Sequence, residues 1–252
     1  MSAKHATIIG SPISPYARKV FGMCVLKGIE FEIDPVVAFF SDDRFTKLSP
    51  VRRIPVYRDD RVTICDSSII CQYLEDAHPS PHLYPKNIEQ RAQARWLEEF
   101  ADTRMGDVIA WKIFQAAVID PGVWNRPRDK AALEAAVTAE LPQVMDYLEE
   151  WAPSYGYIFG DISIAEISII PYFANLNWAR VEPDPNRWPK TMAWVNRVRL
   201  EDAFARFERM AAPLIRTQIA DHRRVLSEQG VKLTPDTYMT RSSPVRGPLT
   251  VK

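Results

Sequence analysis

The sequence is poor in cysteine and histidine, and it has no net charge. Its 252 residues include three cysteines and four scattered histidines. An odd number of cysteines without paired spacing argues against a disulfide framework or a zinc site, so we expect no metal and a reducing, cytoplasmic location. Lysine plus arginine equals aspartate plus glutamate, at 32 each, so no long-range field favours nucleic acid or an acidic membrane.

Long apolar runs are also missing. The N-terminus MSAKHATIIG lacks the apolar segment of a secretory signal, and no apolar run reaches the about 18 residues of a membrane helix. Apolar residues still make up 46% of the chain, which is enough for a sizeable core. The sequence therefore predicts a soluble, folded protein that binds neither membranes nor nucleic acid.

Residues 1–78 alternate short apolar runs with helical patterns. The runs at 6–10, 31–37, 54–57 and 61–65 predict strands, and the last two form a hairpin around Asp59-Asp60. One helix is predicted after Ser14-Pro15, where serine can cap and proline can occupy the first turn, and another over 67–77. This order predicts a small α/β domain over residues 1–78.

The pattern changes at residues 79–88, where three prolines predict a linker. Residues 89–230 then carry only helical patterns, at 89–118, 128–151, 162–181, 189–200 and 204–229, and predict an all-helical domain. The tail, residues 231–252, has three prolines and few apolar residues to anchor it, so we expect it to be flexible or draped on the surface.

Three short motifs in the α/β domain lie where a helix or strand begins. Ser14 starts a helix whose free N–H groups and partial positive charge stabilise an anion such as a thiolate. A cis bond at Ile54-Pro55 would turn the Ile54 backbone toward a peptide-like ligand. At the next helix start, Ser67 and the helix N–H groups can bind a carboxylate, and Asp66 can accept from an ammonium group.

Each motif also has a purely structural interpretation. Ser14, and either Asp66 or Ser67, can be helix caps and nothing more. Arg53 could meet a ligand carboxylate or could be a solvated surface residue. Cis X-Pro bonds are also uncommon, at about 5–6%. The functional hypothesis therefore depends on the order and spacing of the three motifs together.

That order resembles the cytosolic glutathione transferase family over roughly residues 5–210. The strand, the Ser-Pro helix, the Ile-Pro strand, the hairpin, the Asp-Ser helix, the proline linker and the helical bundle follow one another as they do there. Phe159-Gly-Asp-Ile-Ser-Ile-Ala-Glu166 resembles the family's Gly-Asp-x-Ser/Thr-x-Ala-Asp capping box. The resemblance implies an α/β plus all-α fold class, with a thioredoxin-like N-terminal domain followed by a helical bundle.

The resemblance also assigns roles to the motifs. It implies that Ser14 activates the glutathione thiol, as in serine-type members such as the phi class. Ile54-Pro55 resembles the step that pairs with the cysteinyl backbone, and Asp66-Ser67 the pair that holds the γ-glutamyl end. Arg53 lies where a Lys or Gln often sits near the glycyl end. One departure is Arg52, which replaces a glycine that the family often has there.

By the same resemblance we expect a glutathione transferase active in detoxification, with glutathione as co-substrate, a hydrophobic electrophile as second substrate, and a homodimer. Two alternatives remain open. One is a non-catalytic glutathione-binding or interaction module, and the other is a glutathione-dependent isomerase, peroxidase, dehalogenase or ether-cleaving enzyme. A thiol-disulfide reductase would need a nucleophilic cysteine in the site. The variable second-substrate pocket could use several residues for which core or dimer packing is the competing interpretation: Ile13, Tyr16, Arg104, Trp111 and Phe114.

Overall fold

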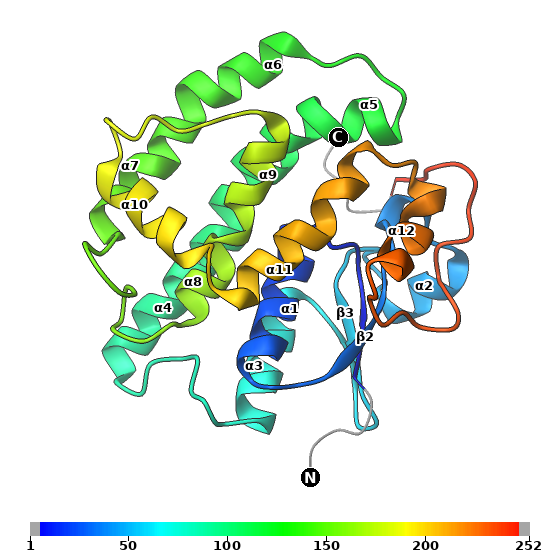
Figure 1. Ribbon diagram of the computed structural model, residues 1–252, viewed down its shortest axis with the longest axis horizontal. Coiled ribbons are helices and arrows are strands. Elements are labelled where there is room, and N and C mark those ends of the chain that lie inside the picture. The colour runs from blue at the N-terminus through cyan, green and yellow to red at the C-terminus, as the bar shows by residue number, and fades with distance from the viewer. Residues whose placement is uncertain (1–5, 247–252) are drawn as a thin grey trace. The chain divides into compact units, whose positions relative to one another are not determined.

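The computed structural model describes residues 6–246, and the chain divides into two compact units (Figure 1). The first unit holds the residues up to 81 together with those from 209 onward, and the second holds residues 82–208. The predicted fold class is confirmed: a thioredoxin-like sheet region is followed by helices. The units differ from the predicted domains in that residues 209–230 cluster with the sheet rather than with the other helices.

Four short strands form the sheet of the first unit in the order β2-β1-β3-β4. They are β1 (Ala6–Ile9), β2 (Phe31–Asp34), β3 (Val56–Arg58) and β4 (Thr63–Cys65). β1 runs parallel to β2 and antiparallel to β3, while β3 and β4 form the predicted hairpin. β2 ends earlier than expected, at Asp34, because Pro35 has no N–H to donate to a neighbouring strand.

The two faces of the sheet carry different helices. Figure 1 shows α1 (Pro15–Leu26) and α3 (Ser67–Ala77) on one side and α2 (Asp43–Leu48) on the other. Ile8 and Ile9 of β1 are both fully buried, and they point to opposite faces because side chains alternate along a strand. Ile9 packs with Phe45 of α2 in a core that Tyr238 and Met239 also contact. The C-terminal segment therefore contributes to the core on the α2 side.

The end of the first unit comprises η4 (Ala212–Arg216), η5 (Ile219–Asp221), α12 (His222–Glu228) and an extended segment. We call residues 232–245 the C-terminal strap. Ile33 of β2 donates to the Lys232 carbonyl (2.9 Å) and accepts from Thr234 N–H (3.1 Å), so the strap covers the outer edge of β2. These contacts hold the described part of the tail against the first unit. The flexibility of the tail stays a prediction, and its last six residues, 247–252, lie outside the described part.

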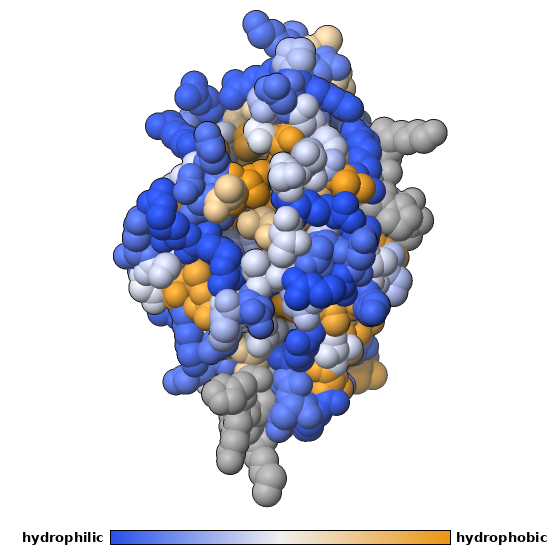
Figure 2. Space-filling view, turned by 90° about the vertical axis from the view of Figure 1, so that its right-hand side faces the viewer, coloured by the Kyte–Doolittle hydropathy of each residue, from blue (hydrophilic) through white to orange (hydrophobic). Residues whose placement is uncertain are grey.

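Figure 2 shows the side of the molecule that lies on the right of Figure 1, where α2, α12 and the strap are found. Hydrophilic side chains cover most of this side, and its hydrophobic areas are small and separate.

Two histidines, one fully and one partly buried, should make the stability of the fold depend on pH. Burial lowers the pKa of His222, which is 1% exposed, and also that of His78. At a pH below about 6.5, the ordinary pKa of histidine, the imidazoles are protonated in the unfolded chain but stay neutral in the folded protein. The free energy of unfolding therefore decreases as the pH falls through that value. We expect the urea midpoint to fall between pH 7.5 and pH 5.5, and to fall less in His222→Leu. Replacing the exposed His82 by glutamine is the control, and an unchanged pH dependence in His222→Leu would contradict the assignment.

The second unit consists of helices. They are α4 (Ile88–Phe100), η2 (Ala101–Ile119), α5 (Asp120–Val123), α6 (Lys130–Ala135), η3 (Ala136–Glu140), α7 (Leu141–Trp151), α8 (Ile164–Ile169), α9 (Pro171–Ala179), α10 (Pro189–Val198) and α11 (Asp202–Ala211), whose last turn belongs to the first unit. The backbone stays helical at both ends of η2, so α4, η2 and α5 form one run that continues past its predicted end at 118. Within residues 6–246, no helix combines the length and the apolarity needed to cross a membrane.

The predicted capping box forms at the start of α8. The Glu166 carboxylate is fully buried and accepts from Ser163 N–H (3.1 Å), the Ser163 hydroxyl (2.9 Å) and Ile158 N–H (2.8 Å). The Ser163 hydroxyl in turn accepts from Ala165 N–H (3.3 Å). Burial raises the pKa of Glu166, and the hydrogen bonds from Ile158 and Ser163 oppose that rise. This box joins the segment before α8 to the helix itself.

Candidate functional site

Ser14 is the N-cap of α1, as predicted. Its backbone is extended (φ −71°, ψ 127°), and its Oγ accepts from Ala17 N–H at 3.4 Å, a long distance for such a bond. A hydroxyl can donate its hydrogen while it accepts. Across residues 6–246, the Ser14 hydroxyl has no other hydrogen-bond partner. Ser14 can therefore cap its helix and donate to a ligand at the same time.

A buried arginine holds the loop that precedes Ser14. The Arg18 guanidinium donates through Nη1 to the carbonyl oxygens of Pro12 (2.6 Å) and Ile13 (2.8 Å), and the residue is buried. The Ser11 carbonyl accepts from Ser14 N–H (3.0 Å) and tightens the same loop. Arg18 therefore brings positive charge close to the start of α1. Sequence reasoning missed this residue, although its position next to Lys19 in an otherwise apolar helix was a possible signal.

The Ile54-Pro55 bond is cis, which is the isomer that the functional hypothesis required. It lies close to the end of β1 and the start of α1. A Cβ atom placed on Gly10 would lie 3.3 Å from Cβ of Ala17 and 3.4 Å from both Cβ of Ile54 and Cα of Pro55. Because a side chain at residue 10 would press on these neighbours, glycine allows strand, helix and cis bond to approach this closely.

Asp66 caps α3 from an unusual backbone conformation. Its φ of 76° and ψ of 127° lie in a region that L-residues rarely adopt, which costs about 1–3 kcal/mol and is typical of ligand sites. Oδ1 accepts from the N–H groups of Ser68 (2.9 Å) and Ile69 (3.2 Å). The exposed carboxylate has no other partner within residues 6–246, so Oδ2 can accept from a ligand. Ser67 follows as the buried first residue of the helix.

Lys19 connects the first and third helices near this position. Its Nζ donates to the Ser68 hydroxyl at 2.8 Å, and the side chain is almost fully buried. The bond joins α1, which begins after Ser14, to the first turn of α3, which begins after Asp66. Sequence reasoning missed Lys19 as well, because lysine is rarely buried and gives no local signal of burial.

Arg52 and Arg53 lie in the turn between α2 and β3. Arg52 adopts a φ of 52°, in the left-handed region that favours glycine, which explains why a glycine suits this position. Its guanidinium donates to the Thr46 hydroxyl (2.8 Å) and to the Ser41 carbonyl (2.7 Å). Arg53 is exposed, and its N–H donates to the Ser49 hydroxyl (3.0 Å). The carboxylate-binding role of Arg53 stays a prediction.

The residues proposed for the second-substrate pocket fall in both units. In the first unit, Ile13 and Tyr16 are half-buried on either side of Ser14. Both are close enough along the chain to contact a substrate bound at Ser14. Their role in a pocket stays a prediction.

In the second unit, the other three candidates lie on η2. Arg104 donates to Glu140 (3.2 Å), Phe114 is 3% exposed with its ring centroid 6.4 Å from that of Trp178, and Trp111 is 39% exposed. Phe114 therefore packs in the core of this unit, and Arg104 is held by carboxylates there. Of these three, Trp111 is the one with much of its surface available.

None of the three cysteines resembles a redox nucleophile. Burial raises the pKa of Cys24, and Cys71 is fully buried. Burial also raises the pKa of Cys65, whose thiol donates to the Leu48 carbonyl at 2.7 Å. Reactive cysteines are accessible and have a lowered pKa. These environments argue against the thiol-disulfide reductase alternative.

Comparison with known proteins agrees with this geometry. Residues 8–82 match the family model described as the glutathione S-transferase N-terminal domain. Maleylacetoacetate isomerase from Rattus norvegicus is 24% identical over 166 residues, which cover 64% of this chain and 73% of that protein.

Two solved structures illustrate the shared fold. A glutathione S-transferase from Sinorhizobium meliloti is 22% identical and superposes with a TM-score of 0.75 over 88% of this chain and 99% of its own. A glutathione S-transferase-I bound with lactoylglutathione is 17% identical, with a TM-score of 0.71 over 81% of this chain and 98% of its own. Residues 8–82 therefore match the glutathione S-transferase N-terminal domain, and the chain shares the fold of solved glutathione S-transferases over most of its length.

Proposed function

We propose that the protein is a glutathione transferase that activates the glutathione thiol for attack on a hydrophobic electrophile. The observation that carries this proposal is the Ser14 hydroxyl, which lies at the start of α1 with its hydrogen available to a ligand. The cis Ile54-Pro55 bond and the strained Asp66 cap lie in the same unit. Together they offer one donor for sulfur, one peptide edge and one site for an amino-acid head group.

In this proposal glutathione binds along the first unit. Asp66 Oδ2 accepts from the γ-glutamyl ammonium group, while Ser67 and the start of α3 bind its carboxylate. The Ile54 backbone pairs with the cysteinyl residue, and Arg53 meets the glycyl carboxylate. Lys19, buried beside the first turn of α3, favours the negative end of the head group.

Thiol activation follows from the local charges. A hydrogen bond from Ser14 to sulfur favours the thiolate, and the partial positive charge at the start of α1 acts in the same direction. Arg18, beside the loop carbonyls, adds to it. The thiol proton leaves to solvent, the thiolate attacks the electrophilic carbon, and a new C–S bond forms as the leaving group departs with its electron pair.

Replacing Asp66 by asparagine tests how the ammonium group is bound. Asparagine keeps the capping oxygen and tolerates a positive φ, but it removes the negative charge. We expect the Kd for glutathione to rise about tenfold, from the loss of a charge-assisted hydrogen bond of about 1.5 kcal/mol. Calorimetric titration with glutathione, and with an analogue that lacks the amino group, measures this.

The analogue makes the result specific. If Asp66 binds the ammonium group, wild type and Asp66→Asn bind the deaminated analogue equally well. Asp76→Asn, which removes an exposed carboxylate near the other end of α3, should bind both ligands as wild type does. An equal loss of affinity for both ligands in Asp66→Asn would mean that only the helix start had changed.

A second candidate activity is glutathione-dependent isomerisation. Two relatives by sequence, from Rattus norvegicus and Mus musculus, are maleylacetoacetate isomerases. The same thiolate could add to a carbon–carbon double bond and leave after rotation about it. Conjugation of 1-chloro-2,4-dinitrobenzene and conversion of maleylacetoacetate, assayed side by side, separate the two activities.

The homodimer and the cytoplasmic location predicted from the sequence belong to the proposed function as well. A measurement of the molecular mass in solution tests the homodimer.

A further inference from the structure

The C-terminal strap contacts the first unit around a buried carboxylate. Asp34 is 1% exposed and lies at the end of β2 opposite Ile9. Its Oδ1 accepts from the Thr237 hydroxyl (2.7 Å) and Arg223 Nη1 (3.2 Å), and its Oδ2 accepts from Tyr238 N–H (2.9 Å). Burial raises the pKa of Asp34, and these contacts oppose that rise. Since a buried carboxylate without partners is costly, Asp34 holds residues 237 and 238 in place.

The strap is also fixed on the side of α2. Tyr238 lies with its ring centroid 5.3 Å from the Arg44 guanidinium carbon and 5.9 Å from that of Arg58, and its hydroxyl accepts from Arg58 (3.0 Å). Its carbonyl accepts from Asp42 N–H (2.8 Å). Cation–π contacts and hydrogen bonds together hold this residue in one position. The strap therefore reaches the segment before α2 in a defined register.

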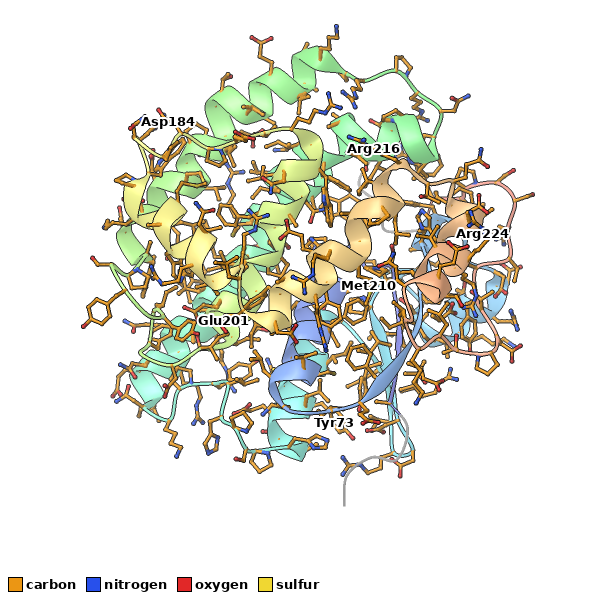
Figure 3. All side chains as sticks on the ribbon, in the orientation of Figure 1. Tyr73, Asp184, Glu201, Met210, Arg216 and Arg224 are labelled. Carbon is orange, nitrogen blue, oxygen red and sulfur yellow. The ribbon has the colours of Figure 1, made fainter. Side chains whose placement is uncertain are left out.

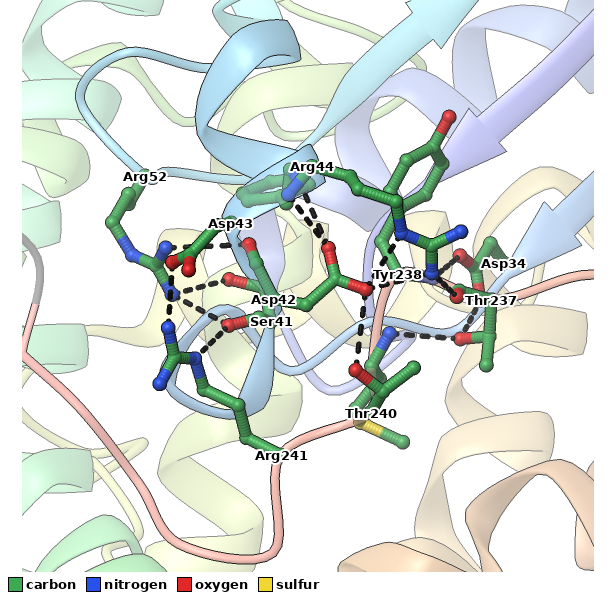
Figure 4. A network of polar contacts seen from close by, with 12 residues as sticks. Asp34, Ser41, Asp42, Asp43, Arg44, Arg52, Thr237, Tyr238, Thr240 and Arg241 are labelled. Carbon is green, nitrogen blue, oxygen red and sulfur yellow. Dashed lines mark hydrogen bonds and ion pairs between the residues drawn. The ribbon is translucent and has the colours of Figure 1, made fainter.

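Next along the strap, Arg241 shares an acceptor with Arg52. Figure 4 shows both guanidinium groups at Ser41. Arg241 Nε donates to the Ser41 carbonyl at 2.9 Å, and Arg52 Nη2 donates to the same oxygen at 2.7 Å. Arg241 also pairs with Asp43 (2.6 Å), and its N–H donates to the Phe40 carbonyl (3.1 Å). Ser41 itself is fully buried, so its carbonyl depends on these donors.

Arg52 links Ser41 to the turn that leads into the proposed glutathione site. Its N–H donates to the Ser49 carbonyl at 2.8 Å. The Ser49 hydroxyl accepts from Arg53 N–H (3.0 Å) and donates to the Arg53 carbonyl (2.9 Å). The next residue is Ile54, whose backbone leads into the cis bond. A continuous set of hydrogen bonds therefore runs from the strap to the turn that presents Ile54.

We propose that Arg241 is a positioning residue for glutathione binding. It fixes the Ser41 carbonyl, the carbonyl fixes the Arg52 guanidinium, and Arg52 fixes the turn of residues 49–54. This inference rests on the proposed function, because it assumes that the Ile54 backbone pairs with glutathione. Ser14 lies outside this set of contacts, so Arg241 acts on binding and not on thiol activation.

Replacing Arg241 by alanine tests the proposal. We expect the Kd for glutathione to rise roughly 2- to 30-fold, with kcat at saturating glutathione unchanged. Arg224→Ala is the matched control, because Arg224 of α12 pairs with Asp221 and Glu228 and its exposed side chain is labelled in Figure 3. The control should bind glutathione as wild type does.

A double-mutant cycle with Arg52→Gly tests the route of the effect. Glycine adopts the positive φ of residue 52 readily, so this variant removes the guanidinium and keeps the turn. In the Arg52→Gly background, Arg241→Ala should raise the Kd no further. An unchanged Kd in Arg241→Ala, or additive effects in the double variant, would overturn the proposal. If wild type itself binds no glutathione, the proposed function fails first, and the two failures are thus distinguishable.

Discussion

Replacing Ser14 by alanine is expected to lower kcat/KM for conjugation about 10²- to 10³-fold. A loss of this size is typical when an enzyme loses one preorganised hydrogen-bond donor to an anion, here the hydroxyl that donates to the thiolate. The Kd for glutathione should change little, because Asp66, Ser67 and Ile54 would still hold the peptide. Without the hydroxyl, the pKa of the bound thiol should rise. Steady-state kinetics with 1-chloro-2,4-dinitrobenzene and calorimetric titration with glutathione measure the two effects separately.

Ser163→Ala is the matched control for this change. Ser163 is also an N-cap serine, but it caps α8 in the second unit. If Ser14 were only a cap, both variants would lose about 1 kcal/mol of stability and neither would lose activity. We expect both to lose stability and only Ser14→Ala to lose activity. Equal kcat/KM values in the two variants would mean that Ser14 only caps its helix and does not activate the thiol.

Replacing Glu166 by alanine is expected to destabilise the second unit by about 3 kcal/mol or more. The change leaves the two buried donors of Ser163 and the partly buried N–H of Ile158 without an acceptor, and each unsatisfied buried group costs about 1–3 kcal/mol. For a unit of this size, the thermal midpoint should fall by about 6–12 °C. Differential scanning calorimetry measures the fall directly.

The control for this prediction is an exposed carboxylate. Glu150→Ala removes a side chain on the surface of α7 and should change the unfolding free energy by no more than about 0.5 kcal/mol. A midpoint for Glu166→Ala as high as that of Glu150→Ala would mean that the capping box does not stabilise this unit.

The sequence revealed those parts of the site that depend on local structure. Ser14 and Asp66 cap helices wherever those helices begin, so their residue types and the apolar pattern after them suffice to find them. The Asp59-Asp60 turn between β-rich runs likewise predicts its hairpin. These features need no knowledge of distant residues.

The parts that the sequence did not reveal depend on distant partners. Asp34 contacts Thr237 and Tyr238 about two hundred residues later, and nothing near either end predicts that pairing. Eight of the fourteen residues of the strap are charged or polar and two are prolines, roughly the composition of a flexible tail. Its order comes from paired charges and hydrogen bonds with the first unit, which composition does not record.

The structural roles of Arg18, Lys19 and Arg52 were missed for a related reason. Each carries a charge that usually implies a surface position, yet Arg18 and Lys19 are buried and hold neighbouring loops or helices. Arg52 occupies a left-handed position of the kind that favours glycine, and its side chain supplies contacts that glycine could not make. Long side chains of this kind take their role from the partners they reach, and the sequence alone does not name those partners.

In the proposed function, the protein binds glutathione at the start of α1 as a thiolate. The most direct test is a pH titration of the thiolate absorbance of glutathione bound to the wild-type protein. We expect a titration midpoint well below the value of about 8.5 of an ordinary cysteine thiol. A midpoint at or above that value, or no binding of glutathione at all, would contradict it.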